Sequence, residues 1–189
     1  SLTPMGFFNY GGFVAMQTLW AGPWMVKVAG YTPLEAATGL FWLNVCMLIT
    51  FWLWGLFTPR LTKHGYSANK LMTYGVPLNF CVQIYIILGG ADAGALHWVL
   101  FCVSSTFVAL AQPAVGMAFP AAVAGRALSA FNLVLFLGVF VVQWGMGLMI
   151  DGFKAQGFIE PQAFQCAMAV YFACCLASYG YFLKHKSDS

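Results

Sequence analysis

Uncharged polar and aromatic side chains that could hold a small solute recur along the apolar stretches of this sequence. In the first stretch, Tyr10, Gln17 and Trp24 follow one another at intervals of seven residues. Seven residues advance an α-helix by two turns, to within about 20° of the starting direction, so these side chains share one helix face. In a later stretch, Asn132 and Gln143 are eleven residues, or about three turns, apart and also share a face. Such faces can bind a solute through amide hydrogen bonds and aromatic contacts.

These amides have two interpretations. An amide left unpaired in an apolar environment costs several kcal/mol, so each one must face another helix or a water-filled cavity. Hydrogen bonding between helices, worth about 0.6–2 kcal/mol per contact, accounts for any single residue. Because polar residues recur along whole faces of the first and fifth stretches, we favour a solute cavity for the set. Its candidate lining residues are Tyr10, Gln17, Trp20, Asn44, Gln112, Asn132 and Gln143.

Patterns typical of catalysis and of metal binding are missing from the sequence. His64, His97 and His185 are far apart, there is no HExxH or CxxC motif, and the Cys174-Cys175 pair is a weak redox candidate. No ionisable side chain lies deep within an apolar stretch, so the chain carries no obvious proton-coupling group. We therefore predict a protein that is not an enzyme and that uses neither a metal nor a cofactor.

The composition indicates that lipid is the solvent for most of the chain. Of its 189 residues, 61% are hydrophobic and 7% are charged, with a mean hydropathy of +0.80. Soluble domains are typically about 25% charged. The net charge of +3 is too small to suggest a nucleic-acid partner. Since the apolar stretches lack the alternation of barrel strands, the fold class is an all-α integral membrane protein.

The apolar stretches predict six transmembrane helices. A membrane helix needs roughly 20 apolar residues, so six of them fill the chain and leave no room for a soluble domain. The predicted helices cover residues 5–28, 36–57, 71–89, 97–119, 127–150 and 163–183. The Thr58-Pro59-Arg60 tripeptide is expected to end the second helix. The chain begins at Ser1 and enters an apolar stretch almost at once, as a fragment or a processed product would.

The basic residues predict the orientation. With six helices, both termini and the second and fourth loops share one side, which holds six of the eight Lys and Arg residues. Those six are Arg60, Lys63, Lys70, Arg126, Lys184 and Lys186. Positive charge favours the cytoplasmic side, so we expect a multi-pass protein of the cell membrane, the inner membrane in a bacterium, with both termini cytoplasmic.

Two Trp-Gly pairs suggest an internal duplication. Trp54-Gly55 and Trp144-Gly145 lie 90 residues apart, each near the end of the second helix in a group of three. Since three is odd, the two groups would be inverted in the membrane, as in the 3+3 inverted repeats of many secondary transporters. Coincidence in a chain rich in Trp and Gly is the alternative explanation.

Two segments resemble the major facilitator superfamily. Residues 55–65 have Gly55 at a helix end, Arg60 five residues later and Gly65 closing a basic loop. This resembles the family's cytoplasmic loop between its helices eight and nine, although Pro59 stands where the family normally has an acid. Residues 124–132, Gly138, residues 143–147 and the Asp151-Gly152 pair are similar to the family's helix eleven and its flanks.

The resemblance implies that the chain is the C-terminal six-helix half of a twelve-helix secondary transporter. The family moves small solutes by alternating access between two six-helix bundles, and Gly55, Arg60 and Gly65 would form its cytoplasmic gate loop. The expected partners are the lipid bilayer, a small-molecule substrate, and the missing N-terminal half or a second copy of this chain. The alternative is a non-transporting membrane subunit that packs against a partner membrane protein.

Overall fold

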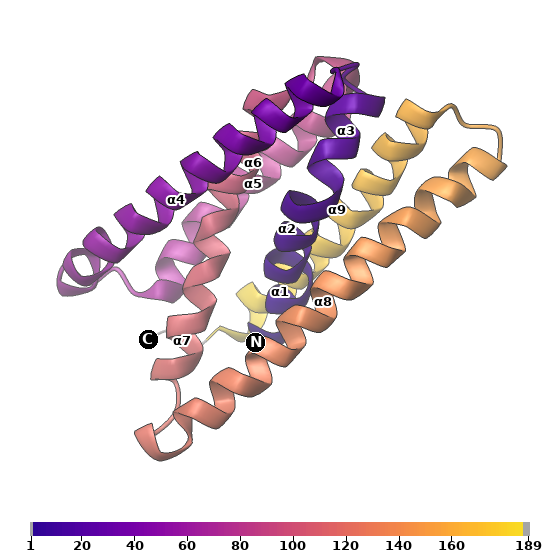
Figure 1. Cartoon of the computed structure of the whole chain (residues 1–189). Helices are drawn as coiled ribbons and strands as arrows, with labels where there is room; N and C mark the ends of the chain where they lie inside the picture. Colours follow the sequence, from indigo (N-terminus) through magenta and orange to yellow (C-terminus); the bar gives the residue numbers. More distant parts are fainter. Residues whose placement is uncertain (1, 187–189) are drawn as a thin grey trace.

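Helices make up the computed structural model, which describes residues 2–186 and contains no β-strand within that range (Figure 1). Five helical stretches are long and apolar enough to cross a membrane. They are α4 (Pro33–Lys63), α5 (Ala68–Gly89) extended by a 3₁₀ turn (Gly90–Asp92), α6 (Ala95–Ser105) continued through a 3₁₀ stretch (Thr106–Leu110) into α7 (Ala111–Met117), α8 (Ala121–Ala155) and α9 (Glu160–His185). The predicted all-helical fold is confirmed, and five stretches have the length and the apolar composition of membrane-spanning helices.

The first predicted helix is present as a mixed segment rather than a regular α-helix. Short α-helical pieces, α1 (Leu2–Met5), α2 (Gly12–Ala15) and α3 (Ala21–Lys27), are joined by two π-helical stretches, Gly6–Gly11 and Met16–Trp20. We call residues 2–27 the N-terminal segment. A π-helical turn is wider than an α-helical one, so each stretch rotates the side chains that follow it. The seven-residue spacing of the sequence is therefore not preserved as a single face.

Side-chain caps fix where α4 and α5 begin. The Thr32 hydroxyl accepts a hydrogen bond from the Glu35 amide at 3.2 Å, and the Glu35 carboxylate accepts one from the Thr32 amide at 2.8 Å. Pro33 follows in the first helical position, where its missing N–H costs nothing. Ser67 caps α5 in the same manner, accepting from the Lys70 amide at 3.3 Å.

Helix α4 continues through Pro59, contrary to the expectation that it would end there. It runs to Lys63, and the His64 amide still donates to the Arg60 carbonyl at 3.2 Å. A proline removes one amide donor but leaves the rest of the turn able to form. The chain leaves the helix direction just after Lys63, at Gly65, whose φ of +82° favours a residue without a side chain. The five long helical stretches begin or end up to six residues away from the predicted spans, as at the end of α4 and the start of α8.

A second internal proline, Pro77, is compensated by a neighbouring helix. Its missing amide leaves the carbonyl of Thr73, four residues earlier, without its helical donor. The hydroxyl of Tyr179 in α9 donates to that carbonyl at 2.6 Å. The proline therefore joins α5 to α9 by a hydrogen bond that an unbroken helix would not need.

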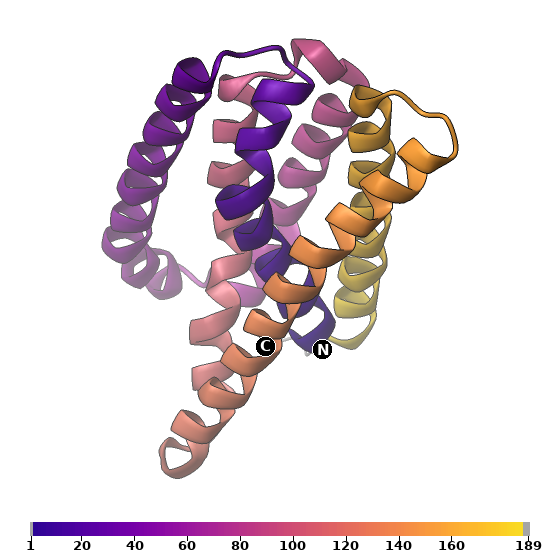
Figure 2. The ribbon, with the colours of Figure 1, turned by 45° about the vertical axis from the view of Figure 1, so that its right-hand side comes forward.

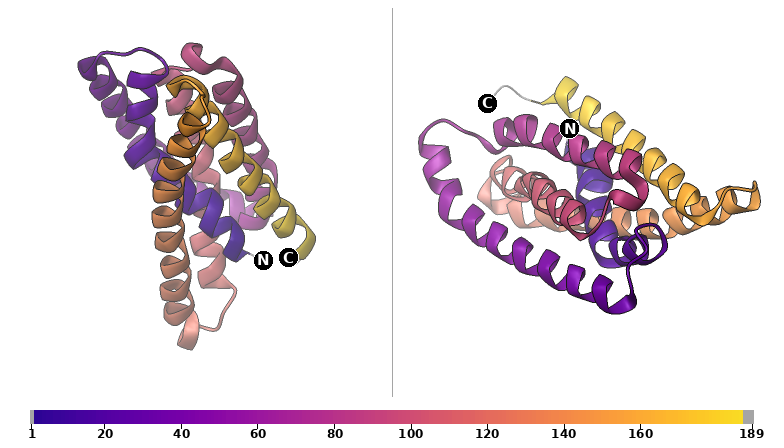
Figure 3. Two further views of the ribbon diagram at one scale, coloured as in Figure 1. Left: turned by 90° about the vertical axis from the view of Figure 1, so that its right-hand side faces the viewer. Right: turned by 90° about the horizontal axis from the view of Figure 1, so that it is seen from above.

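The N-terminal segment lies inside the bundle, whereas α4 lies at its edge. Seen from above, α4 and α9 lie along opposite edges (Figure 3), and α4 stands at one side of the bundle (Figure 2), where it packs on α6 and hardly on α5. Helix α8 crosses the N-terminal segment closely, because a Cβ at Gly138 would collide with the Phe7 carbonyl and one at Gly11 would lie 2.6 Å from the Leu135 carbonyl. Both contacts are between backbones and require glycine.

Candidate functional site

The seven predicted cavity residues belong to three separate groups of hydrogen-bonded residues. The first group joins the N-terminal segment, α7 and α8. The Gln112 side-chain amide donates to Asn132 Oδ1 at 2.8 Å, and the Tyr10 hydroxyl lies 3.5 Å from Gln112 Oε1. The first distance is that of a well-formed hydrogen bond, whereas the second is at the limit of one. Tyr10 is thus held loosely beside a firm amide pair.

The second group joins the N-terminal segment to α4. Gln17 lies in the π-helical stretch Met16–Trp20 and donates to Asn44 Oδ1 at 3.2 Å. The Asn44 amide in turn donates to the carbonyl of Leu40, one turn earlier in α4, at 2.8 Å. This pair is the polar contact through which α4 meets the middle of the N-terminal segment.

The third group joins the N-terminal segment to α8. The Trp20 indole donates to the backbone carbonyl of Gln143 at 3.2 Å, and the Gln143 side chain donates to the Thr18 hydroxyl at 3.0 Å. Thr18 donates to the carbonyl of Val14 at 2.7 Å. Thr18 was not among the predicted residues, although its position beside Gln17 in a polar stretch was a usable signal.

Partial exposure distinguishes the seven residues from the core. Asn44 is exposed and the other six are half-buried. Solute-binding groups need this property, because a side chain sealed inside a protein core cannot meet a ligand. The groups join the N-terminal segment to α4, α7 and α8 and remain three separate clusters. The seven residues, which we call the polar face, therefore do not form the walls of one enclosed cavity.

Trp24 leaves the face that the sequence assigned to it. It is only 2% exposed, and its indole donates to the Ala93 carbonyl in the turn before α6 at 3.0 Å. Its ring meets that of Trp98 with centroids 5.8 Å apart. The two π-helical stretches before Trp24 change its direction, so a spacing of seven no longer returns to Tyr10 and Gln17.

A second polar set is buried on the other side of the N-terminal segment. Asn9 donates to the Ser178 hydroxyl in α9 at 2.6 Å. In α5, Asn79 donates to the Ser105 hydroxyl at 2.8 Å and accepts from the Gln83 amide at 2.7 Å. All five residues are buried, so these bonds lock helices together. Asn9 and Ser178 were not singled out from the sequence, because lone polar residues in apolar stretches gave no repeating pattern.

The residues of the expected gate loop do not share a loop. Gly55 and Arg60 lie within α4, and only Gly65 lies in the turn that follows it. The Arg60 guanidinium lies 5.8 Å from the centroid of the Phe57 ring, one turn earlier. The prediction that these residues form a loop is wrong, because the helix survives Pro59.

Ion pairs gather at the end of the bundle opposite to Arg60. The Glu160 carboxylate lies 3.2 Å from the ammonium of Lys27 and 3.1 Å from that of Lys154. One acid thereby links the ends of the N-terminal segment, α8 and α9. Within residues 2–186, no group of three or more His, Cys, Asp or Glu side chains is placed to hold a metal ion.

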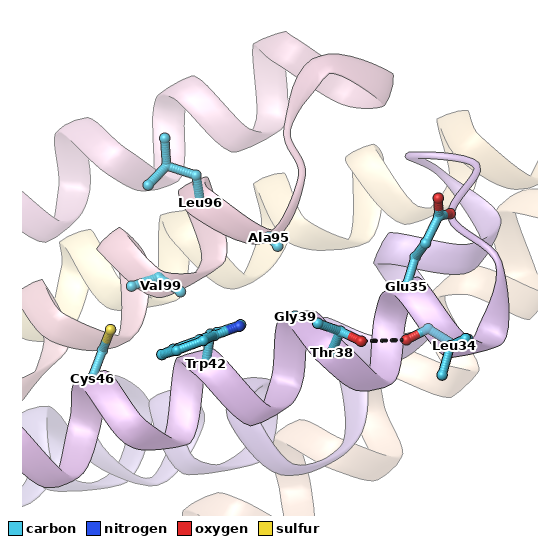
Figure 4. A pocket seen from close by; sticks show the side chains of 9 residues that line it. All are labelled: Leu34, Glu35, Thr38, Gly39, Trp42, Cys46, Ala95, Leu96 and Val99. Carbon is cyan, nitrogen blue, oxygen red and sulfur yellow. Dashed lines mark hydrogen bonds between the residues drawn. The ribbon is translucent and has the colours of Figure 1, made fainter.

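Two of the surface grooves lie beside the helices that carry these polar residues. The first, about 560 Å³, lies between α4 and α6, where Trp42 and Val99 line a mostly apolar hollow (Figure 4). Its one acid, Glu35, is engaged in capping Thr32. The second, about 460 Å³, lies between Leu19 of the N-terminal segment and α8. We call it the α8 groove, and it includes Gln143, a member of the third group.

Comparison with known proteins finds no relative, since no protein-family model, no curated protein and no solved structure matches the chain.

Proposed function

We propose that this chain is a six-helix bundle of a secondary active transporter, moving a small solute by alternating access in the manner of the C-terminal half of the major facilitator superfamily. The observation that carries the proposal is the set of three hydrogen-bonded groups. They arise from one region of the N-terminal segment and reach α4, α7 and α8. A solute that offers hydrogen-bond donors and acceptors can replace these partners one at a time.

The irregular N-terminal segment supports a binding role. Polar residues Tyr10, Gln17 and Trp20 all lie within its π-helical stretches. Such stretches are frequent at functional sites, and broken helices near the membrane midplane carry the substrate sites of many transporters. Pro23 in α3 adds a further position at which the helix lacks a donor.

The packing supports a 3+3 inverted repeat. Number the helical stretches one to six, with the N-terminal segment first and α9 last. An inverted repeat would relate stretch one to stretch four, two to five, and three to six. It therefore predicts that a contact between stretches one and five is matched by a contact between stretches four and two. A contact between stretches three and four is likewise matched by one between stretches six and one, and all four contacts are present. The contact between five and six lacks a strong counterpart between two and three, because α4 packs on α6 and hardly on α5.

The distribution of charge supports cytoplasmic termini. The start of α1, the end of α9 and the turns after α4 and α7 lie at one end of the bundle (Figure 1). That end carries the six basic residues named above. The other end carries Glu160 and the two lysines that it binds. In the proposed orientation the basic end faces the cytoplasm.

Transport assays on two variants test this function. Cells producing the protein would be screened for uptake of labelled amines, sugars and carboxylates, and the solute found would be used throughout. Gln17→Leu and Asn132→Leu should abolish uptake with unchanged protein levels, because each removes a polar partner from the face. Gln162→Leu is the matched control, since Gln162 is exposed in the first turn of α9, away from the three groups. Unchanged uptake in both test variants would reject the assignment.

The large apolar side of α4 favours a second candidate, a membrane subunit that packs against a partner. Only 11% of the most apolar stretch of α4 is buried within the chain. In this case, the same two Leu variants would lose a co-purifying membrane protein while no solute is taken up. The partner in either case is a further six-helix half or a second copy of this chain.

A further inference from the structure

The α8 groove has a chemically mixed lining arranged along one helix. Phe140, Gln143, Gly147 and Asp151 follow one another at intervals of three or four residues. This spacing places them on one side of α8, in a row that leads to the end of the bundle where Glu160 binds the two lysines. The row therefore begins beside an aromatic ring, passes an amide and ends at a carboxylate.

Aromatic rings form the wall of the groove. The rings of Phe140 and Trp144 are stacked, with centroids 6.4 Å apart and planes 18° from parallel. Trp144 is 62% exposed, so its ring face is accessible from the groove. The negative face of an indole ring attracts organic cations as well as apolar groups.

Gly147 has no side chain to fill the groove, and it lies beside Trp20 of the polar face. A Cβ at Gly147 would be 3.6 Å from the ring of Trp20. Trp20 in turn donates to the Gln143 carbonyl. The groove thus includes Gln143 of the third hydrogen-bonded group and lies against Trp20 of the same group.

Asp151 is the one ionisable side chain that lines the groove, and it has no cation of its own. Lys154 lies one turn further along α8, but its ammonium is 3.1 Å from the Glu160 carboxylate. Lys27 is likewise held by Glu160 at 3.2 Å. Among residues 2–186 these are the two ion pairs, so Asp151 has no ion-pair partner there.

The two other acids that line surface hollows are less suited to this role. The carboxylate of Glu35 accepts the capping hydrogen bond from the Thr32 amide. Asp92 lines a hollow built from α5 and its own 3₁₀ extension, far along the chain from the polar face. Only Asp151 combines a free charge, an exposed aromatic wall and contact with the third group.

We propose that the α8 groove binds a small organic monocation, with its ammonium at Asp151 and its aromatic or apolar body against Trp144, which lies seven residues, or about 10 Å, earlier along α8. The inference rests on the proposed transport function, of which it names the solute class. Gln143 and Trp20 would then receive the cation as it leaves the groove for the polar face.

Equilibrium binding to the protein in nanodiscs tests the charge preference. The probes are 2-phenylethylammonium, 2-phenylethanol and 3-phenylpropanoate, which share a phenylethyl body and differ in charge. We expect the cation to bind up to about fivefold more tightly than the alcohol, from its ion pair with the exposed Asp151, and more tightly still than the anion, which that carboxylate repels. Equal affinities of the unmodified protein for the three probes would overturn the proposal. This test needs no substitution, so it does not depend on whether a variant folds.

Four variants locate the site. Asp151→Asn should remove the preference for the cation, Asp151→Glu should keep it, and Trp144→Leu should weaken all three probes. Asp92→Asn is the matched control and should bind as the unmodified protein does. A preference that survives Asp151→Asn, or that falls equally in Asp92→Asn, would overturn the proposal.

Uptake measurements separate this inference from the transport function. If another solute is taken up in a manner that depends on Gln17 and Asn132, while the three probes bind equally, the cation assignment fails alone. If the cation binds selectively but no solute crosses the membrane in proteoliposomes, the transport function fails and the binding site stands.

Discussion

The hydrogen bond from Tyr179 to Thr73 should stabilise the bundle only because Pro77 is present. The Tyr179 hydroxyl is 2.6 Å from the Thr73 carbonyl, which has lost its helical donor to the proline. A typical hydrogen bond contributes about 1 kcal/mol, and bonds between membrane helices average about 0.6 kcal/mol with a maximum near 1.7. Because this carbonyl has no alternative helical partner, we expect Tyr179→Phe to cost about 1–1.5 kcal/mol of unfolding free energy.

The same substitution should cost much less after Pro77→Ala. Alanine restores an amide at position 77 that can donate to the Thr73 carbonyl, so the Tyr179 hydroxyl becomes redundant. The expected cost in that background is about 0.5 kcal/mol or less, which gives a coupling energy of about 1 kcal/mol in a double-mutant cycle. Tyr74→Phe is the control, at an exposed tyrosine of α5, the helix that contains Pro77, and it should be neutral in both backgrounds.

Unfolding titrations in mixed micelles of a mild detergent and SDS would measure the four free energies of the cycle. If Tyr179→Phe costs the same with proline and with alanine at position 77, within about 0.5 kcal/mol, the reasoning is refuted. Tyr179 would then stabilise the protein through its ring, which lies 5.3 Å from that of Phe80 between centroids.

Three further outcomes are expected. Gly138→Ala should destabilise the protein by more than about 2 kcal/mol in the same titration, because its methyl group meets the Phe7 carbonyl, whereas Gly145→Ala, with open space around it, should be neutral. Glu160→Gln should lower the melting temperature at low ionic strength and have little effect near about 1 M salt, since its pairs with lysines such as Lys154 are exposed and screened. Fluorescent tags fused to either terminus should report from the cytoplasm, and an external report from either would reverse the proposed orientation.

The sequence indicates which polar residues need a partner, but it does not indicate how they group. Composition alone indicates helices in lipid, and amides in apolar stretches must find partners, so residues such as Gln112 and Asn132 could be singled out. Which amide meets which depends on how the helices cross. That crossing depends on backbone contacts between glycines and neighbouring carbonyls, as at Gly138, and no periodicity in the sequence reports it.

Local irregularities account for the errors. The seven-residue spacing that placed Trp24 on the same face as Gln17 assumes a uniform α-helix. The π-helical stretch Met16–Trp20 rotates the side chains that follow it, including that of Trp24. The rule that proline ends a helix failed at Pro59, where the helix continues to Lys63. A proline inside a helix makes the helix less stable, and the helix continues where packing against its neighbours offsets that loss of stability. Neither outcome can be read from residue types alone.

The two polar sets of the bundle have different mechanical consequences. The bonds of Asn9, Asn79 and Gln83 are short and buried, so breaking them would expose unpaired groups to an apolar interior. The bonds around Tyr10 and Gln17 are longer and partly exposed, so water or a solute can replace each partner as it leaves. A conformational change that separates α4 from the N-terminal segment therefore costs little at Gln17, whereas one that separates α5 from α6 costs a great deal. Helix α4 remains tied to the stretch between α6 and α7, because the Trp54 indole donates to the Thr106 hydroxyl at 2.9 Å, so a movement during transport would carry α4 and that stretch together.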